Sequence, residues 1–284
     1  GAMIVLEGGT ESQKQEILPA IAGGTQTLAL AVTEPDYGWK PENIGMNATR
    51  KKGGYVLNGC KLFVHDACAA SHLICAVRTG SGDDPSQGVS LFVIDAKSPG
   101  VSVRNLPGFM SWVGEVTFDS VDVPDNALLG DETDCGWQIL ERGMEKAIPI
   151  LCAYKVGGCE AVFEMSVGYS QTRIQFGIPI GRFQRVQDHI IEVVNRLDAA
   201  RWSTYEAIWK LDTGRPAAEG VHIAKAISSD AYYMACNHVH EVHAGVGVMT
   251  EYGLTLHTKM SRTLYHYLGA PKHHKRQLAK VLEL

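Results

Sequence analysis

The sequence has no long apolar run and no large excess of charge of either sign. None of the 284 residues lies in a stretch approaching the ~18 uncharged apolar residues of a membrane-spanning helix, and no basic segment followed by an apolar one opens the chain. Acidic side chains number 31 and basic ones 26, so the net charge of -5 does not suit a surface that follows nucleic-acid phosphates. We therefore expect no membrane span, no nucleic-acid partner, and a location in the bacterial cytoplasm or an organelle matrix.

Paired cysteines are also missing. The seven cysteines are an odd number, with no Cys-x-x-Cys pair and no histidine partner at the spacing of a zinc site. They are predicted to be reduced and mostly packed thiols, and no metal site is expected.

The first half of the chain changes from a helical to a strand pattern. Residues 1–25 have an apolar start and then helical periodicity over 11–22, which is typical of the end of a helical unit. Residues 26–131 are rich in β-branched side chains between turn residues, and Asn58-Gly59 favours a hairpin turn. Strands are expected at 27–33, 55–57, 60–64, 72–78, 89–94, 101–106 and 115–123.

Residues 132–284 have a helical period. Asp134 is a suitable N-cap, Pro149 should bend the helix that follows, and Pro271 can start the final segment. The helices are expected over 134–148, 186–214, 221–245 and 264–282. The chain is thus predicted to have an α+β fold, in which a β-barrel or sandwich precedes an antiparallel four-helix bundle.

Several strings resemble the acyl-CoA dehydrogenase family. Val32-Thr33-Glu34-Pro35 with Gly38 resembles its first flavin loop. Arg-Ile-Gln-Phe-Gly at 173–177 with Phe183-Gln184 resembles its bundle signature, and His-Ala-Gly-Val-Gly at 243–247 resembles its glycine-rich turn. The strings occur in the family's order along essentially the whole chain. The resemblance implies the acyl-CoA dehydrogenase fold, with the end of an N-terminal α-domain at 1–25, the middle β-domain at 26–131 and the bundle at 132–284.

The resemblance also implies FAD as the cofactor. Arg173 is expected early in a bundle helix, where its charge can pair with a pyrophosphate. An aromatic ring can pack on a flat cofactor, and glycine permits a tight turn of positive φ near phosphate. His65 replaces the hydroxyl that is common in the family, and Glu241 replaces a glutamine near the pyrophosphate, where a second anion would repel. The residues implied at FAD are Val32, Thr33, Gly38, Phe63, His65, Arg173, Phe176, Gln184, Glu241 and Gly245.

The catalytic carboxylate of the family is missing from both of its usual places. The implied reaction transfers the α-proton of an acyl thioester to a carboxylate, while the flavin accepts hydride from the β-carbon. Most members place this glutamate between a tyrosine and a glycine near the C-terminus, where this chain has Leu268. Others place it on the first bundle helix, where this chain has Ala147. Glu145 is the candidate for a displaced base, and a polar contact is its alternative role.

These observations leave several functions open. The first is an active FAD-dependent acyl-CoA dehydrogenase, with acyl-CoA as substrate and an electron-transfer flavoprotein as partner. The second is a non-catalytic subunit of a mixed oligomer, which completes a neighbour's FAD site. The third is a flavin monooxygenase or oxidase on the same scaffold, which needs no α-proton base, and a flavin-free structural protein is the fourth. FAD shared across an interface implies a homo- or hetero-oligomer, expected as a dimer of dimers.

Overall fold

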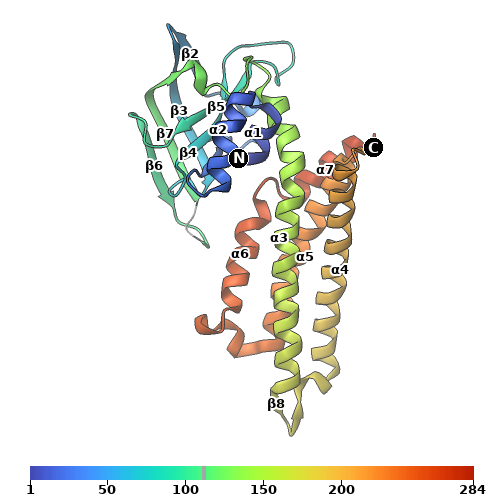
Figure 1. Ribbon diagram of the computed structural model, residues 1–284. Coiled ribbons are helices and arrows are strands. Elements are labelled where there is room, and N and C mark those ends of the chain that lie inside the picture. Colours follow the sequence, from blue (N-terminus) through green and yellow to red (C-terminus); the bar gives the residue numbers. More distant parts are fainter. Residues whose placement is uncertain (111–112) are drawn as a thin grey trace. The chain divides into compact units, whose positions relative to one another are not determined.

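The chain folds into two units, which are described separately. The computed structural model describes residues 1–110 and 113–284, and its internal contacts separate residues 1–144 from residues 145–284. The first unit has two short helices and a β-sheet, and the second is helical (Figure 1). The predicted α+β fold is confirmed, whereas the three domain boundaries expected from the sequence stay a prediction. Among the described helices, none is long and apolar enough to cross a membrane.

Two helices, α1 (Ala2–Gly8) and α2 (Glu11–Ala22), open the first unit. The Thr10 hydroxyl accepts from the Gln13 amide, and the Gln13 side chain accepts from the Thr10 amide, which forms a capping box. The same Gln13 side chain also donates to the Leu128 carbonyl at 2.6 Å and accepts from the Gly130 amide at 3.1 Å. The start of α2 is therefore tied to the segment that follows the last strand of the sheet.

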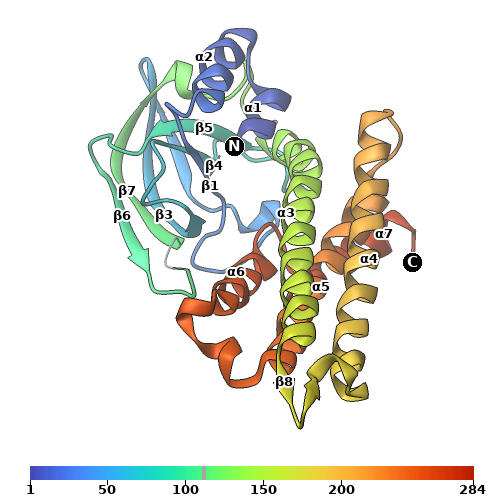
Figure 2. The same ribbon diagram turned by 60° about the horizontal axis from the view of Figure 1, so that its bottom comes forward.

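The sheet of this unit has seven strands and curls around one hydrophobic cluster (Figures 1 and 2). Its order is β1-β4-β2-β3-β7-β6, and β5 pairs with β4. Residues 73–77 of β4 are all buried, because one set faces this cluster and the other faces a second cluster with α1, α2 and the first turns of α3. The strands are β1 (Leu28–Ala31), β2 (Asn47–Lys51), β3 (Gly54–His65), β4 (His72–Arg78), β5 (Val89–Asp95), β6 (Val101–Leu106) and β7 (Val113–Pro124).

The hairpin expected at Asn58-Gly59 is wrong. β3 continues through these residues, because the segments on both sides of them pair with β7 and only the register shifts. The Asn58 side chain accepts from the Ser120 amide at 2.7 Å, so the asparagine serves the β3–β7 pair. The turn lies earlier, between β2 and β3, where Gly53 has a φ of 82°.

The second unit is a bundle of three long helices and two shorter ones. The helices are α3 (Gly136–Thr172), which begins in the first unit, α4 (Gln184–Asp212), α5 (Ala218–His243), α6 (Leu254–His266) and α7 (Pro271–Val281). Small and medium side chains from α3, α4 and α5, such as Cys159, Leu197 and Ala235, are buried in its core. The short strands and 3-10 turns of the chain are β8 (Ile174–Gln175), β9 (Ile178–Pro179), η1 (Pro41–Asn43), η2 (Asp125–Ala127), η3 (Ile180–Arg182), η4 (Ala244–Val248) and η5 (Thr250–Tyr252).

The ends of two expected helices differ from the prediction. Asp134 has a φ of 70° and accepts from the Thr79 hydroxyl at 2.7 Å, so its side chain braces a loop, and α3 begins at Gly136. The helix is 37 residues long and continues through Pro149 to Thr172. Burial of Ile148, Pro149 and Cys152 favours continuation, because packing outweighs one lost backbone hydrogen bond. At the other end, α6 stops at His266, which leaves Leu268 in the turn before α7.

A buried ion pair fixes the loop between β1 and β2. The Lys61 amine is 0% exposed and donates to the Glu34 carboxylate at 2.6 Å and to the Val32 carbonyl at 3.2 Å. The amides of Gly45 and Met46 donate to the same carboxylate at 3.0 and 3.1 Å. Glu34 therefore links both ends of this loop to β3.

Two more lysines are buried in the bundle, and they contact a serine rather than an acid. The amines of Lys155 and Lys225 donate to the Ser229 hydroxyl at 2.7 and 3.3 Å. Burial, together with the nearby Lys225 charge, lowers the pKa of Lys155. Between the lowered native pKa and the unfolded value of about 10.4, the Lys155 amine binds a proton in the unfolded chain but not in the native state. The free energy of unfolding should therefore rise with pH over this range.

The first prediction concerns the ion pair of the sheet unit. Lys61→Met leaves the Glu34 carboxylate buried without its cation, so we expect the free energy of unfolding to fall by roughly 3–5 kcal/mol. The double variant Glu34→Gln with Lys61→Met should recover most of this loss. Urea unfolding at pH 7 measures both, and Lys40→Met, in an exposed pair with Glu42, is the control. An equal loss in Lys40→Met would refute the special role of the buried pair.

The second prediction concerns pH. Lys155→Met removes a buried amine that must lose its proton on folding, and each unit of pKa shift corresponds to about 1.4 kcal/mol. We expect the variant to be at least as stable as the parent at pH 7 and to show a weaker rise of stability between neutral and alkaline pH. Urea unfolding across this pH range measures the slope, with the exposed Lys280→Met as the control. An unchanged slope in Lys155→Met would contradict the assignment.

Candidate functional site

In the first unit, the loop after β1 lies directly beside the end of β3. The Leu62 amide donates to the Thr33 carbonyl at 2.8 Å, so Thr33 and Phe63 are brought together from distant parts of the sequence. Val32 is 2% exposed and anchors the loop in a hydrophobic cluster. In the structure, Val32 therefore supports the loop from the core, and Thr33 and Phe63 lie nearer the surface.

Two aromatic rings form an exposed patch at this place. Phe63 has a φ of 53° next to a register shift in β3, and its side chain is 49% exposed. The Tyr37 ring, which is 68% exposed, lies 5.7 Å from the Phe63 ring. His65 is half-buried near the end of the same strand, and burial lowers the pKa of its imidazole, which keeps it neutral at pH 7. The patch has the flat, apolar character on which a ring system can pack.

Gly38 is required by the packing of the loop. A Cβ atom at this position would approach the Asn43 side chain to 1.9 Å. Asn43 cannot simply move away, because it donates to the Asp36 carboxylate at 2.7 Å, and the Gly38 amide donates to the same carboxylate at 3.0 Å. These hydrogen bonds lower the pKa of Asp36. Gly38 thus lets the loop close on itself next to the aromatic patch.

In the second unit, Arg173 and Phe176 lie in the β8–β9 hairpin. The expectation that Arg173 stands early in a helix is wrong, because α3 ends at Thr172 and the arginine follows it. Phe176 has a φ of 53° and is 93% exposed, and its ring meets the Phe183 ring edge-on at 6.0 Å. Gln184, the first residue of α4, is also exposed. The hairpin therefore presents a cation, an aromatic ring and an amide on the surface of the bundle.

The glycine-rich turn after α5 differs in detail from the expectation. The positive φ of 48° falls on Ala244 rather than on Gly245, which has open space at its Cβ position. Gly247 is packed, since a Cβ atom there would approach His240 and His243 to 3.0 Å. Glu241 is exposed near the end of α5.

The expected positions of a catalytic base carry no carboxylate. Leu268 has a φ of 54° in the turn between α6 and α7 and is followed by Gly269 at 97°. Ala147 is partly buried in α3, and Glu145, two residues before it, is partly buried and engaged in an interaction. The only one of these three side chains that can accept a proton is therefore Glu145.

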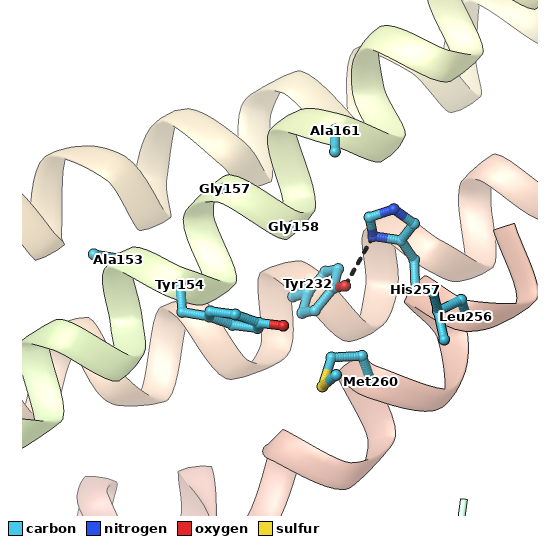
Figure 3. Close-up of a pocket in the computed structure, with 9 residues that line it drawn as sticks. All are labelled: Ala153, Tyr154, Gly157, Gly158, Ala161, Tyr232, Leu256, His257 and Met260. Carbon is cyan, nitrogen blue, oxygen red and sulfur yellow. Dashed lines mark hydrogen bonds between the residues drawn. The ribbon is translucent and has the colours of Figure 1, made fainter. Parts of the chain in front are cut away.

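The bundle also contains an apolar pocket that is separate from the expected site residues. Its volume is about 430 Å³, and Gly157 and Gly158 of α3 form one wall without side chains. Figure 3 shows the Tyr232 hydroxyl and the His257 ring directed at each other, and their atoms lie 3.0 Å apart. Burial lowers the pKa of His257 and raises that of Tyr232. These groups are thus neutral at pH 7, and the pocket offers no charge for catalysis.

Sequence reasoning missed two residues of the sheet half. Lys61 holds the loop through Glu34, and Tyr37 provides the second ring of the aromatic patch. A lysine among the apolar residues of an expected strand was a signal for Lys61, because such a charge needs a partner. No comparable signal marks Tyr37.

Comparisons with known proteins agree with this geometry. The acyl-CoA dehydrogenase middle domain matches residues 29–121, and the acyl-CoA dehydrogenase C-terminal domain matches residues 134–283. An acyl-CoA dehydrogenase of Bacillus subtilis (strain 168) is 30% identical over 99% of this chain and 75% of its own length. An L-prolyl-[peptidyl-carrier protein] dehydrogenase of a Serratia species is 31% identical over 88% of this chain and 65% of its own length.

Solved structures give the same result. The FAD complex of PigA has a TM-score of 0.93 at 28% identity, and it covers 100% of this chain and 74% of its own. Butyryl-CoA dehydrogenase from Megasphaera elsdenii also has a TM-score of 0.93, at 26% identity, with 100% and 75% covered. The chain spans about three-quarters of the length of these two proteins. On the sequence of its β-domain and bundle and on their folds, the chain belongs to the acyl-CoA dehydrogenase family.

Proposed function

We propose that this chain binds FAD and takes part in the α,β-dehydrogenation of an acyl thioester. When bound, FAD supplies the acceptor for the hydride that leaves the β-carbon. The observation that carries the proposal is the exposed hairpin with Arg173 and Phe176, which has no evident use in a protein without a large anionic, aromatic ligand. The Phe176 ring is 93% exposed, so covering it with a ligand or partner would contribute favourable hydrophobic free energy.

The bundle residues fit a dinucleotide. Arg173 is permanently charged and can pair with a pyrophosphate, and Phe176 offers a flat face. Gln184 adds amide donors at the start of α4. Because these three side chains project from the end of the bundle, we expect them to reach FAD held mainly by a neighbouring subunit. The assembly that we propose is a homo- or hetero-oligomer, arranged as a dimer of dimers.

The sheet residues fit the flavin end of the same cofactor. Thr33 has a hydroxyl, the aromatic patch of Phe63 and Tyr37 has an apolar face, and Gly38 keeps the loop closed beside them. The neutral His65 imidazole can donate or accept one hydrogen bond without adding a charge. These groups can orient a ring system and exclude water from one of its faces.

A second candidate function is a subunit that holds FAD but depends on a carboxylate from a partner chain. Leu268 and Ala147 favour it, because neither side chain can take the α-proton. In this form of the proposal the chain contributes Arg173, Phe176 and Gln184 to the flavin of its neighbour. In the first form, Glu145 is the base. The two forms share the substrate class and differ in the source of one carboxylate.

The acyl carrier and the electron acceptor follow from the relatives by analogy. Acyl-CoA is the proposed substrate, since several relatives are named for acyl-CoA, although one is named for a prolyl group on a peptidyl-carrier protein. A protein described as an electron transferring flavoprotein of Acidaminococcus fermentans is similar to this chain, with a TM-score of 0.92. We propose an electron-transferring flavoprotein as the partner that reoxidises the flavin.

The third prediction concerns FAD binding. Arg173→Met should weaken FAD binding by about 10- to 100-fold, because a hydrogen bond to a charged group contributes roughly 1.5–3 kcal/mol. Glu241→Gln should strengthen binding, since it removes a negative charge near the proposed pyrophosphate. Calorimetric titration of the apo-protein with FAD measures both, and Arg276→Met, on exposed α7, is the control. An unchanged affinity in Arg173→Met would contradict the proposed contact.

The fourth prediction concerns the base. When the FAD-loaded chain alone meets an acyl-CoA without oxygen, we expect Leu268→Glu to bleach the flavin at least about 100-fold faster than the parent chain, which lacks a carboxylate at this position. Leu268 already has a positive φ, so glutamate adds no new backbone strain. Stopped-flow absorbance measures the rate, with Leu268→Gln as the matched control.

The other outcomes separate the remaining functions. Bleaching by the parent chain that Glu145→Gln abolishes would assign the base to Glu145. Bleaching only after a partner chain is added would support the subunit. Flavin reduction that requires an external reductase, followed by oxygen uptake, would replace dehydrogenation by a monooxygenase or oxidase function.

A further inference from the structure

Two lysines in the core of the bundle are almost completely removed from water. Lys155 of α3 is 1% exposed and Lys225 of α5 is 0% exposed. The ion pairs found among residues 1–110 and 113–284 include neither of these amines. Burial lowers the pKa of both amines, and their N–H groups must find hydrogen-bond acceptors among neutral oxygen atoms.

One serine connects the two amines. The Ser229 hydroxyl donates to the Lys225 carbonyl at 2.7 Å, and its two lone pairs accept from Lys155 at 2.7 Å and from Lys225 at 3.3 Å. All the hydrogen-bonding capacity of this hydroxyl is used. Lys155 therefore holds Ser229, and Ser229 in turn helps to hold Lys225.

The Lys225 amine also reaches the turn between α6 and α7. It donates to the Gly269 carbonyl at 2.6 Å, which is its shortest contact. On the other side of the turn, the His274 Nε2 atom lies 2.8 Å from the Leu268 carbonyl and must donate to it. Two consecutive carbonyls of this turn are thus fixed by two buried side chains from α5 and α7.

A second histidine fixes the state of the first. When His274 donates through Nε2, its Nδ1 atom is an acceptor in the neutral ring, and His222 Nδ1, 3.0 Å away, is the donor. Burial lowers the pKa of His274 to about 3 and that of His222 to about 4, so both rings are neutral at pH 7. The contact to Leu268 is therefore held in one tautomer.

The turn itself needs this support. Leu268 and Gly269 have φ values of 54° and 97°, a left-handed pair that is unfavourable at the leucine. A Cβ atom at Gly269 would approach His274 Nε2 to 2.6 Å, so the histidine packs directly against the glycine. Residue 268 is also where the resemblance to the family places a catalytic carboxylate.

We propose that Lys225 and His274 are positioning residues, which hold the 268 and 269 carbonyls and so fix the direction of the side chain at position 268. The assignment of a role to this direction rests on the proposed dehydrogenation. Lys155 acts one step further away, through Ser229. The chain thus has a rigid backbone turn at position 268, where the resemblance implies a carboxylate and this chain has leucine.

Hydrogen exchange of the parent protein and its variants tests whether the turn at residues 268 and 269 is rigid, and it needs no activity measurement. Lys225→Met should speed exchange of the Gly269 amide, which donates to the His266 carbonyl at 3.0 Å, by about tenfold or more. Exchange in α4 should stay unchanged. Lys225→Arg should restore much of the protection, and Lys272→Met, on the exposed side of α7, is the control. Unchanged exchange at Gly269 in Lys225→Met, or an equal rise throughout the bundle, would overturn the proposal.

Two variants of His274 give a second test, which does not depend on whether Lys225→Met folds. His274→Gln retains an N–H donor for the Leu268 carbonyl, whereas His274→Leu does not. The proposal requires faster exchange of the 267–270 segment in the leucine variant and rescue in the glutamine variant. The same exchange in both variants would show that the contact does not hold the turn.

Activity then tests the functional part. In the Leu268→Glu background, adding Lys225→Met should lower the rate of flavin bleaching at saturating acyl-CoA by about tenfold or more, with little change in acyl-CoA affinity. A loss of affinity with an unchanged rate would contradict positioning. If Leu268→Glu itself fails to bleach, the proposed dehydrogenation fails, while the exchange results still decide whether Lys225 and His274 hold the turn.

Discussion

A charged group that folding removes from water must find compensation, and this constraint determines how a loop of the sheet unit and a turn of the bundle unit are held. In the sheet unit, Lys61 and Glu34 form an ion pair at 2.6 Å that holds the loop carrying Thr33 and Gly38. In the bundle, Lys225 has no carboxylate and instead uses the Ser229 hydroxyl and the Gly269 carbonyl. Lys61 and Lys225 each donate to a backbone carbonyl, so each ties its own position to the backbone of a loop or turn.

The two halves differ in what these supports present. The loop held by Lys61 carries a hydroxyl, a glycine and an aromatic patch, all suited to a flat ring. The turn held by Lys225 and His274 presents a leucine, where the family's usual reaction requires a carboxylate. The chain therefore has the fold of the acyl-CoA dehydrogenase family, but no carboxylate at either of the two positions where the resemblance implies one. This combination explains why the proposed function includes a carboxylate that the chain does not supply from position 268 or 147.

The sequence predicted the elements whose signals are local. Proline at the first position of α7, the strand pattern of β4 and the long periodicity of α5 were sufficient for correct assignments. It failed where distant contacts decide. Asn58-Gly59 has the composition of a hairpin turn, but pairing of both flanking segments with β7 extends the strand. A helix was expected over 134–148 with a bend at Pro149, but burial of Ile148, Pro149 and Cys152 lets α3 continue to Thr172.

The short strings identified the family, and the site residues that they imply stay a prediction. Tyr37 of the loop at 32–38 and Phe176 of the string at 173–177 are exposed, whereas Val32 is buried and Arg173 follows a helix instead of starting one. The contacts of Lys225 and His274 were not predictable. Lys225 lies 44 positions from Gly269 and His274 lies 6 positions from Leu268, and each pair meets only in the folded bundle. Buried polar contacts of this kind leave no periodic pattern.

The absence of a base can be measured without any redox step. When the FAD-loaded chain alone is incubated in D₂O with a saturated acyl-CoA, nuclear magnetic resonance follows the loss of the α-proton signal. The account predicts loss no faster than in buffer, because positions 268 and 147 carry no carboxylate and the Glu145 side chain already takes part in another interaction. Rapid loss of the signal with the parent chain would contradict it, since the chain would then contain an effective base of its own.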